Sequence, residues 1–417
     1  MLYRRVAWER GLVGLALFGL TLFGLTPLVA RAADDADPFG PQLEWKPVLE
    51  IRGRVEGAGA PLPDSHTIGQ VARVGVEAQR GILSARVSLQ ALRAWSGNGD
   101  ATSSEGSFLP ELAEGWARFD GELSPNVGAR LTIGRQAIQI DDGRLVGLRA
   151  WDLQQQFLDA FRFELQANPL SFELVNARRF GVGWGPGAAG SDASGDDPFT
   201  FGVTVLRLGG AREGANADGR IDAVSVVDAR KTTFVTSTTG FFGELSMGRA
   251  QGSGEAYVQQ NNQGNATFGA LDLGWVVGLN RAWVVHARYT DASGGSDVAG
   301  SRGSAALSAF QPVLGDSHDQ FGLLDLMQPG DDVRGLSDLA ALAEVQAGAR
   351  LAVRGSVHRL ASSLSGGGGY KVYGYEADLS LTWHVTPYAV VDLGVGQVLG
   401  GSLGHRSGAY LQIDVAL

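Results

Sequence analysis

The segment Leu43–Glu56, LEWKPVLEIRGRVE, alternates apolar and charged side chains. Its apolar positions are Leu43, Trp45, Pro47, Leu49, Ile51 and Val55, and its charged positions are Glu44, Lys46, Glu50, Arg52, Arg54 and Glu56. Because successive side chains of a β-strand point to opposite faces, this period of two predicts a strand with one apolar and one charged face. The same alternation returns at 83–91, 389–396 and 410–417, so the sequence predicts an all-β protein.

About eighteen such runs follow one another along the chain. They lie at 43–56, 68–79, 82–95, 112–121, 126–140, 157–166, 170–180, 199–208, 221–229, 232–247, 254–261, 265–279, 281–291, 335–346, 348–361, 370–384, 387–400 and 408–417. After the N-terminal segment no apolar run is long enough for a spanning helix, so a membrane protein of this sequence has to cross as a closed barrel. We therefore expect a closed antiparallel transmembrane β-barrel of about 18 strands, with a soluble all-β protein as the alternative.

The links between the predicted strands differ in length in a regular way. Short links lie at 80–81, 167–169, 279–281 and 384–387, and long links lie at 96–111, 141–156, 181–198, 292–334 and 362–369. A bacterial barrel with short periplasmic turns and longer external loops has this rhythm, although the long link at 209–220 departs from it. We expect residues 33–417 to form one outer-membrane barrel domain. The link 292–334 is a candidate for an outer lid, or for a passive mobile loop.

Residues 1–32 have the features of a cleaved signal peptide, with a single transmembrane helix as the alternative. Basic residues precede an apolar run, which ends before a small-residue cleavage site (Arg4, Arg5 and Arg10; 12–25; Ala30–Ala32). Their removal takes away four arginines and one glutamate, so the formal net charge of −10 becomes −13, which argues against nucleic acid as a partner. The chain has no cysteine, which excludes disulfides and thiolate metal sites.

The stretch Gly134–Trp151, GRQAIQIDDGRLVGLRAW, places three arginines in an apolar link that should face the outside. If this link folds into the barrel, its apolar side chains can anchor it to the wall. Arg135, Arg144 and Arg149 would then face the water-filled lumen, where basic side chains select for anions. The alternative is that Arg144 and Arg149 pair with Asp141, Asp142 or Asp152 and only hold the loop in shape.

Arg135 is a special case within this stretch. Counted from Leu131 and Ile133, it falls on the outward face of its strand. A lumen position therefore requires a bulge at Gly134, and an outward position requires that Arg135 lie near an interface.

Arginines recur on the polar side of the predicted strands. They are Arg52, Arg54, Arg73, Arg86, Arg118, Arg130, Arg162 and Arg354, and the acidic residues on the same faces include Glu50, Glu56, Glu77, Glu114, Asp120 and Glu164. We expect a lumen lined by both signs of charge, in which Arg52, Arg54, Arg86, Arg130 and Arg162 belong to the pore lining. Cross-strand ion pairs are the alternative for any one of them.

Aromatic residues near the predicted strand ends fit girdles at the two lipid interfaces, although ordinary packing is the alternative. These residues are Trp45, Trp95, Trp275, Trp283, Tyr373, Trp383 and Tyr388.

Two blocks of the sequence resemble the alginate-export family of outer-membrane β-barrels. The first joins GRQ, DDGRLVG, Trp151 and FLDAFRFEL, and the second is HDQFGLLDLMQPGDDVRGLSDL, with YEADLSLTWHV and YAVVDLGVGQVLGG near the C-terminus. The resemblance implies an 18-stranded barrel that secretes an anionic polysaccharide through an electropositive constriction. It implies a basic motif of Arg135, Arg144 and Arg162 with Asp142 and Asp159 as acidic neighbours. It also implies a periplasmic scaffold and an inner-membrane synthase as partners, besides outer-membrane lipid.

These observations predict a porin for an anionic exopolysaccharide, with an uptake porin for small anionic solutes as the alternative. An enzyme is not expected, because no nucleophile motif is present and the histidines have no ligand spacing. These are His66, His286, His318, His358, His384 and His405. We expect neither a cofactor nor a metal.

Overall fold

The computed structural model describes residues 43–59, 63–96, 110–152, 155–178, 202–214, 217–231, 234–261, 264–278, 283–295, 309–316, 318, 320–332, 334–363 and 370–417. The predicted signal peptide and the link 181–198 lie outside these residues. Its strands are β1 (Glu44–Gly59), β2 (Pro63–Arg80), β3 (Leu83–Ser96), β4 (Glu111–Ser124), β5 (Val127–Gln136), β6 (Leu158–Ala167), β7 (Leu170–Arg178), β8 (Val203–Arg212), β9 (Ala217–Lys231), β10 (Phe234–Met247), β11 (Ala250–Asn261), β12 (Gly264–Val277), β13 (Trp283–Ser293), β14 (Gly335–Gln346), β15 (Leu351–Ala361), β16 (Val372–Thr386), β17 (Ala389–Leu399) and β18 (Arg406–Ala416).

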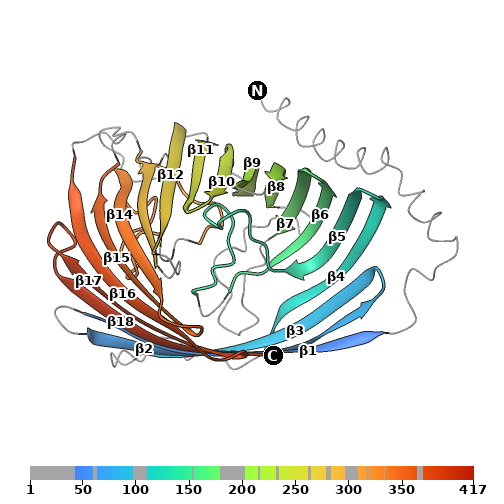
Figure 1. The fold of residues 1–417 in the computed structure, drawn as a ribbon, viewed down its shortest axis with the longest axis horizontal. Helices are drawn as coiled ribbons and strands as arrows, with labels where there is room; N and C mark the ends of the chain where they lie inside the picture. Colours follow the sequence, from blue (N-terminus) through green and yellow to red (C-terminus); the bar gives the residue numbers. More distant parts are fainter. Residues whose placement is uncertain are drawn as a thin grey trace, which may run out of the picture.

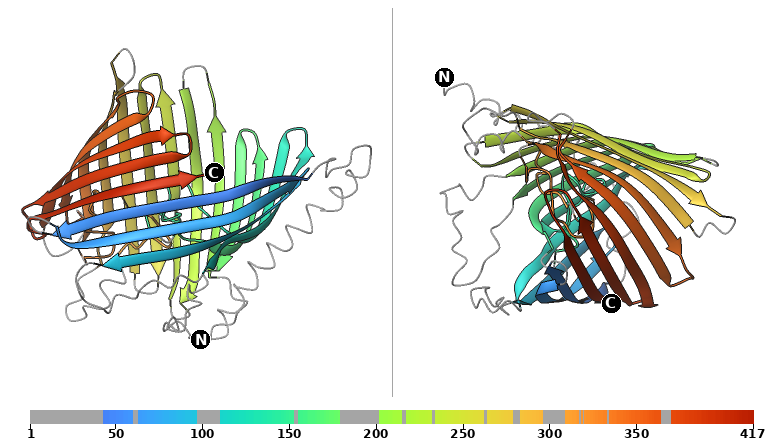
Figure 2. Two further views of the ribbon diagram at one scale, coloured as in Figure 1. Left: turned by 90° about the horizontal axis from the view of Figure 1, so that it is seen from below. Right: turned by 90° about the vertical axis from the view of Figure 1, so that its left-hand side faces the viewer.

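The strands form one closed antiparallel barrel. Each strand pairs with the next along the chain, and β1 pairs with β18 from Glu50↔Ala416 to Gly59↔Ser407, which closes the wall. Figure 1 shows the resulting ring, and Figure 2 shows the strands inclined to one another around it. The predicted 18-stranded barrel is confirmed. Among the described residues no helix is long and apolar enough to span a membrane.

The two rims of the barrel differ. At the short-turn rim, where β1 begins and β18 ends, the links after the even-numbered strands have five residues or fewer. At the long-loop rim lie the links after β3, β5, β7 and β13, together with shorter ones. The exception expected at 209–220 is absent, because β8 and β9 extend towards each other and leave only residues 213–216 between them.

The outer face of the wall is apolar. Val76, Val87, Ile133, Leu208 and Leu273 all expose more than a third of their surface. Near the short-turn rim the exposed aromatic side chains are Trp45, Trp275, Trp283, Trp383 and Tyr388, which is the position of an interfacial girdle. An apolar exterior on a closed barrel is the architecture of outer-membrane proteins, and the predicted location is confirmed.

Tyr373 is a correction to the predicted girdle. Its ring is 1 % exposed and its hydroxyl donates to the Gly335 carbonyl at 3.0 Å, so it packs inside the barrel. The side chain of Trp95 lies outside the described residues.

Two links fold into the barrel. We call the described residues of 137–157 the first inward segment and those of 309–332 the second. Figure 1 shows the first, in teal between β5 and β6, within the ring. The segments are joined by backbone hydrogen bonds, from the Gly147 N–H to the Leu314 carbonyl and from the Leu314 N–H to the Leu145 carbonyl, both 3.0 Å long.

Hydrophobic burial holds both segments in place. Ile138, Ile140 and Val146 of the first segment and Phe310 and Leu314 of the second are almost fully buried. They pack with Val175, Ala177, Val203, Val205, Val224, Val226, Tyr257 and Phe268 on the inner wall. Because each fully buried side chain of this size contributes about 1.5–3 kcal/mol, the cluster can hold two otherwise irregular segments.

The two inward segments correct two expectations from the sequence. Strand β5 ends at Gln136 rather than at residue 140, because the chain leaves the wall there and turns into the lumen. The described part of the link 292–334 is a packed internal element rather than an outer lid, since its apolar side chains bury against the first segment and the wall.

Candidate permeation site: arginines above buried carboxylates

Four arginines stand side by side on the inner wall. They are Arg130 on β5, Arg162 on β6, Arg207 on β8 and Arg220 on β9, and we call them the arginine row. Each alternates with outward-facing apolar neighbours, as Arg207 does with the exposed Leu206 and Leu208. The row therefore faces the lumen.

Ion pairs link three of these arginines to one another, and Arg220 has carboxylate partners of its own. Arg130 lies 2.5 Å from Asp120 and 3.8 Å from Glu164, which pairs with Arg162 at 3.3 Å. Glu173 on β7 joins Arg162 at 2.7 Å to Arg207 at 2.9 Å. Arg220 then pairs with Asp222 at 2.7 Å and with Glu244 at 3.6 Å.

Burial differs between the two signs of charge. The side chains of Arg162, Arg207 and Arg220 are 20–32 % exposed, whereas those of Glu173 and Asp222 are only 1 % exposed. Glu173 and Asp222 therefore lie beneath the guanidinium groups, whereas Glu164 and Glu244, 23 % and 52 % exposed, stay accessible beside them. Arg130 is the most exposed member, and its partner Asp120 is nearly as exposed.

Gly209 makes room for one of these carboxylates. A Cβ at Gly209 on β8 would lie 1.9 Å from Asp222 Oδ1 and 2.7 Å from Ser171 Oγ. Only a glycine therefore lets the Asp222 carboxylate sit in its buried position under Arg220.

The first inward segment adds Asp141 to this site. Its carboxylate lies 2.9 Å from Arg220 and 3.4 Å from Arg207, and its side chain is 2 % exposed. Burial, followed by the negative charge of Asp222, raises the pKa of Asp141 to about 7 despite the two arginines. The loop thus places its own carboxyl group where two guanidinium groups converge.

Arg144 and Arg149 both form ion pairs with acidic residues of the same segment, which is the alternative considered for them in the sequence analysis. Arg144 pairs with Asp142 at 3.0 Å and with the buried Glu255 of β11, and is 11 % exposed. Arg149 pairs with Asp152 at 2.7 Å and is 44 % exposed. Arg144 therefore anchors the segment to the wall, while Arg149 stays partly exposed.

Arginines at the β1–β2 seam hold the far side of the first inward segment. Arg52 Nη1 donates to the Ala150 carbonyl and Arg54 Nη1 to the Trp151 carbonyl, both at 2.5 Å. Arg73 Nη2 donates to Gln155 Oε1 at 2.8 Å. These arginines act as clamps, and Arg52 also pairs with Asp414 of β18 across the closing seam at 2.7 Å. The first inward segment thus crosses the lumen from the β8–β11 side of the wall to the side formed by β1 and β2.

Arg86 faces the lumen from β3. It pairs with Glu77 at 3.4 Å and with Glu114 at 3.3 Å, and is 29 % exposed. Glu114 is only 8 % exposed, so Arg86 repeats in isolation the arrangement of the arginine row.

Arg135 and Asp159 do not line the lumen. Gly134 has a positive φ of 119°, yet the register of β5 continues without a shift through Trp116↔Gly134 and Gly115↔Arg135. Arg135 therefore stays on the outward face with Ile133. Its register partner Asp159 lies between the inward-facing Leu158 and Ala160, and the two side chains pair at 2.8 Å. We leave both out of the pore lining.

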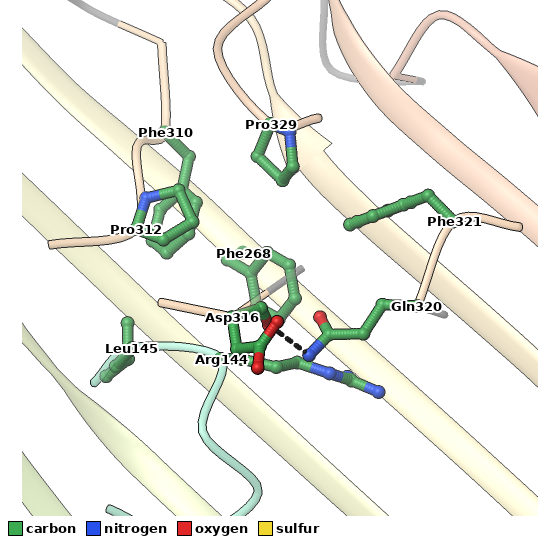
Figure 3. Close-up of a pocket in the computed structure, with 9 residues that line it drawn as sticks. All are labelled: Arg144, Leu145, Phe268, Phe310, Pro312, Asp316, Gln320, Phe321 and Pro329. Atoms are coloured by element: carbon green, nitrogen blue, oxygen red, sulfur yellow. Dashed lines mark hydrogen bonds between the residues drawn. The ribbon is translucent and has the colours of Figure 1, made fainter. Parts of the chain in front are cut away.

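A small pocket lies where the two inward segments meet (Figure 3). Phe268, Phe310 and Phe321 line it together with Arg144, and the Gln320 amide donates to the Asp316 carbonyl at 2.6 Å beside it. The guanidinium in this pocket is already paired with Glu255. Among the described residues no cluster of His, Cys, Asp or Glu side chains is arranged to hold a metal ion.

The interpretation of the sequence missed half of the arginine row. Arg220 fell in the link before the predicted strand 221–229, and Arg207 was not singled out. The available signal was alternation, since VTVLRLGGAR places Arg207 opposite two leucines. Glu173 and Asp222 were also not singled out, although the same alternation was available for them.

Comparison with known proteins shows the fold. No protein-family model and no curated protein matches the chain. Among solved structures, the outer membrane protein OpdK of Pseudomonas aeruginosa shares 12 % identity at a TM-score of 0.57, over 90 % of this chain and 99 % of that one. A structure of OpdK with vanillate shares 11 % identity at a TM-score of 0.57, over 90 % of this chain and 98 % of that one. OccK5 (OpdH) from the same organism shares 9 % identity at a TM-score of 0.56, over 90 % of this chain and 98 % of that one.

These comparisons correct the predicted family and partners. The similar barrels named above are OpdK and OccK proteins rather than alginate exporters, and no family model matches the chain. Apolar–polar alternation is common to the strands of outer-membrane barrels, so the blocks at 134–164 and 318–338 did not discriminate between families. The polysaccharide, the periplasmic scaffold and the synthase were implied by that resemblance alone and are withdrawn with it.

Proposed function

We propose that this outer-membrane porin passes small anionic solutes, above all carboxylates, along the arginine row. The observation that supports this proposal is the difference in burial, since exposed guanidinium groups stand over carboxylates that are 1–2 % exposed. At Arg162, Arg207 and Arg220 a solute meets the guanidinium groups before it meets the buried carboxylates of Glu173, Asp141 and Asp222.

The spacing of the row supports stepwise passage. Arg162 and Arg207 share Glu173, at 2.7 and 2.9 Å. Arg207 and Arg220 share Asp141, at 3.4 and 2.9 Å, so successive guanidinium groups lie on either side of one carboxylate. A carboxylate leaving one guanidinium is then within reach of the next. Each guanidinium already has a protein partner, as Arg162 and Arg207 have in Glu173, so the solute competes for it and is held weakly enough to leave.

The solute class is also suggested by a similar structure. OpdK, whose structure was solved with vanillate, binds a small aromatic carboxylate. The 18-stranded fold is shared with that protein at low identity, so the ligand comes to this chain only as a proposal. An arginine row is chemically suited to a carboxylate, because a guanidinium can donate two parallel hydrogen bonds to its oxygens.

Ion selectivity in planar bilayers tests the proposal. A potassium chloride gradient should give a reversal potential of the sign expected for an anion-preferring pore, and benzoate in place of chloride should reduce the current by occupying the row. Proteoliposomes should take up benzoate faster than a neutral sugar of similar size. A cation-preferring pore, or equal rates for the two solutes, would contradict the proposed function.

A further inference from the structure

One carboxylate of the first inward segment binds to two members of the arginine row through a single oxygen. Arg220 Nη2 donates to Asp141 Oδ1 at 2.9 Å, and Arg207 Nη1 donates to the same oxygen at 3.4 Å. The other oxygen, Oδ2, is buried and accepts no hydrogen bond from the part of the chain that the structure describes. Asp141 thus takes up hydrogen-bond donors of both arginines while its own second oxygen stays unsatisfied.

The backbone on both sides of Asp141 is fixed. Ile140 is 2 % exposed, its N–H donates to the Val146 carbonyl, and its carbonyl accepts from the Gly143 N–H, both at 2.9 Å. Gln139 Nε2 donates to the Asp141 carbonyl at 3.2 Å. Asp141 itself has a φ of 52°, a left-handed conformation that a non-glycine residue keeps only where its surroundings hold it. Release of the carboxylate from the arginines therefore requires only a rotation of the side chain, with the segment in place.

We propose that Asp141 is a built-in competitor of the permeating solute, so that its carboxylate and that of the solute bind to Arg207 and Arg220 in turn. This role presupposes the proposed function and names the residue that sets how tightly the pore binds its solute. Arg207 and Arg220 are 20 % and 32 % exposed, so a solute in the lumen can reach both. The two carboxylates need the same donors and repel each other, so binding of one weakens binding of the other.

The surroundings of Asp141 make it a weak competitor. The charged and titratable groups around it are Arg207 of β8, Arg220 and Asp222 of β9, Tyr257 of β11, Asp142 beside it in the segment, and Glu173 of β7 and Glu244 of β10, which pair with the same two arginines. Burial, followed by the negative charge of Asp222, raises the pKa of Asp141 to about 7. Asp141 therefore competes as an anion above that pH and becomes a neutral, weaker acceptor below it.

Block of the chloride current by benzoate tests the proposal on the full-length protein in planar bilayers. The half-blocking concentration of benzoate measures its affinity for the arginine row. At about pH 8.5 the Asp141→Asn variant should need about fivefold less benzoate than the wild type, because a neutral amide replaces the competing anion. At about pH 5.5 the two proteins should agree, because protonation has already neutralised Asp141 in the wild type.

Two further variants complete the test. Asp142→Asn is the matched control, because it removes the same charge from the next residue of the turn, where the carboxylate pairs with Arg144 and not with the row. Its half-blocking concentration should stay close to that of the wild type. Asp141→Ala removes the acceptor as well as the charge and should lower the concentration at least as far as Asp141→Asn does.

The wild type alone also gives a decisive reading, because its half-blocking concentration should fall about fivefold from about pH 8.5 to about pH 5.5. An equal concentration for the wild type and Asp141→Asn at the higher pH, an equal fall in Asp142→Asn, or a pH dependence that persists in Asp141→Asn would overturn the proposal. The reversal potential on the same membranes separates the two ideas. A cation-preferring wild-type pore contradicts the proposed function, whereas any of these three results in an anion-preferring pore contradicts only the role of Asp141.

Discussion

Replacing Arg207 by glutamine changes the charge of the permeation site at one defined point. Arg207 is 20 % exposed and lies 2.9 Å from Glu173 and 3.4 Å from Asp141. The amide removes one positive charge from the lumen side and leaves the buried carboxylates beneath it. A solute carboxylate near this position should then be bound more weakly.

The magnitude follows from Coulomb's law with partial screening. Two unit charges about 4 Å apart interact by about 1 kcal/mol in water and about 4 kcal/mol at an effective dielectric constant near 20. A side chain one-fifth exposed in a wet pore lies between these limits, and competition from Glu173 brings the value towards the lower one. We take about 1 kcal/mol, which corresponds to about a fivefold change in an equilibrium constant.

The assay is the reversal potential across a planar bilayer under a potassium chloride gradient. The anion-to-cation permeability ratio should fall about fivefold for Arg207→Gln. Glu173→Gln is the matched variant of opposite sign, because it removes the carboxylate that Arg207 and Arg162 share, and it should raise the ratio. An unchanged ratio for Arg207→Gln, or a shift in the same direction for both variants, would refute the reasoning from buried and exposed charge.

Further outcomes concern the inward segments. Because the folded pKa of Asp141 is raised to about 7, above its unfolded value, ionisation destabilises the folded state. The free energy of unfolding should therefore fall as pH rises from about 4 to 7 and level off above, a dependence that chemical denaturation should no longer show in Asp141→Asn. Lowering the pH through 7 should also free Arg220 from an ionised partner and raise anion preference, and a pH-independent reversal potential would contradict this. Ile140→Ala empties a site that is 2 % exposed and should cost about 2–5 kcal/mol. If the first inward segment detaches from the wall, the single-channel currents of the Ile140→Ala variant should be larger and noisier than those of the wild type. Wild-type traces from the variant would mean that burial does not hold the segment. Gly315→Ala would place a Cβ 2.0 Å from the Arg144 carbonyl, so it should separate the two segments and expose them to trypsin, and wild-type resistance would argue against close packing there.

The local sequence pattern was sufficient to predict those features that depend only on residues close together in the chain. The alternation in Leu43–Glu56 predicts a strand and both of its faces, because the side-chain period of a strand is two and the membrane selects one face as apolar. The outward position of Arg135 follows from the same count. The apolar residues around Ile140 and Val146 predict that the link folds into the barrel, since burial is favourable wherever the segment lands.

Only the tertiary structure decided which charges meet. Asp141 reaches Arg207 and Arg220, 66 and 79 residues away, and Arg52 reaches Asp414 across the seam, 362 residues away. These partners depend on the landing point of the first inward segment and on the closure of β1 against β18. Both are set by packing between distant parts of the chain, which no short window of sequence contains. Burial of the carboxylates under the arginine row has the same origin, because it is the shape of the closed wall that leaves one sign of charge exposed.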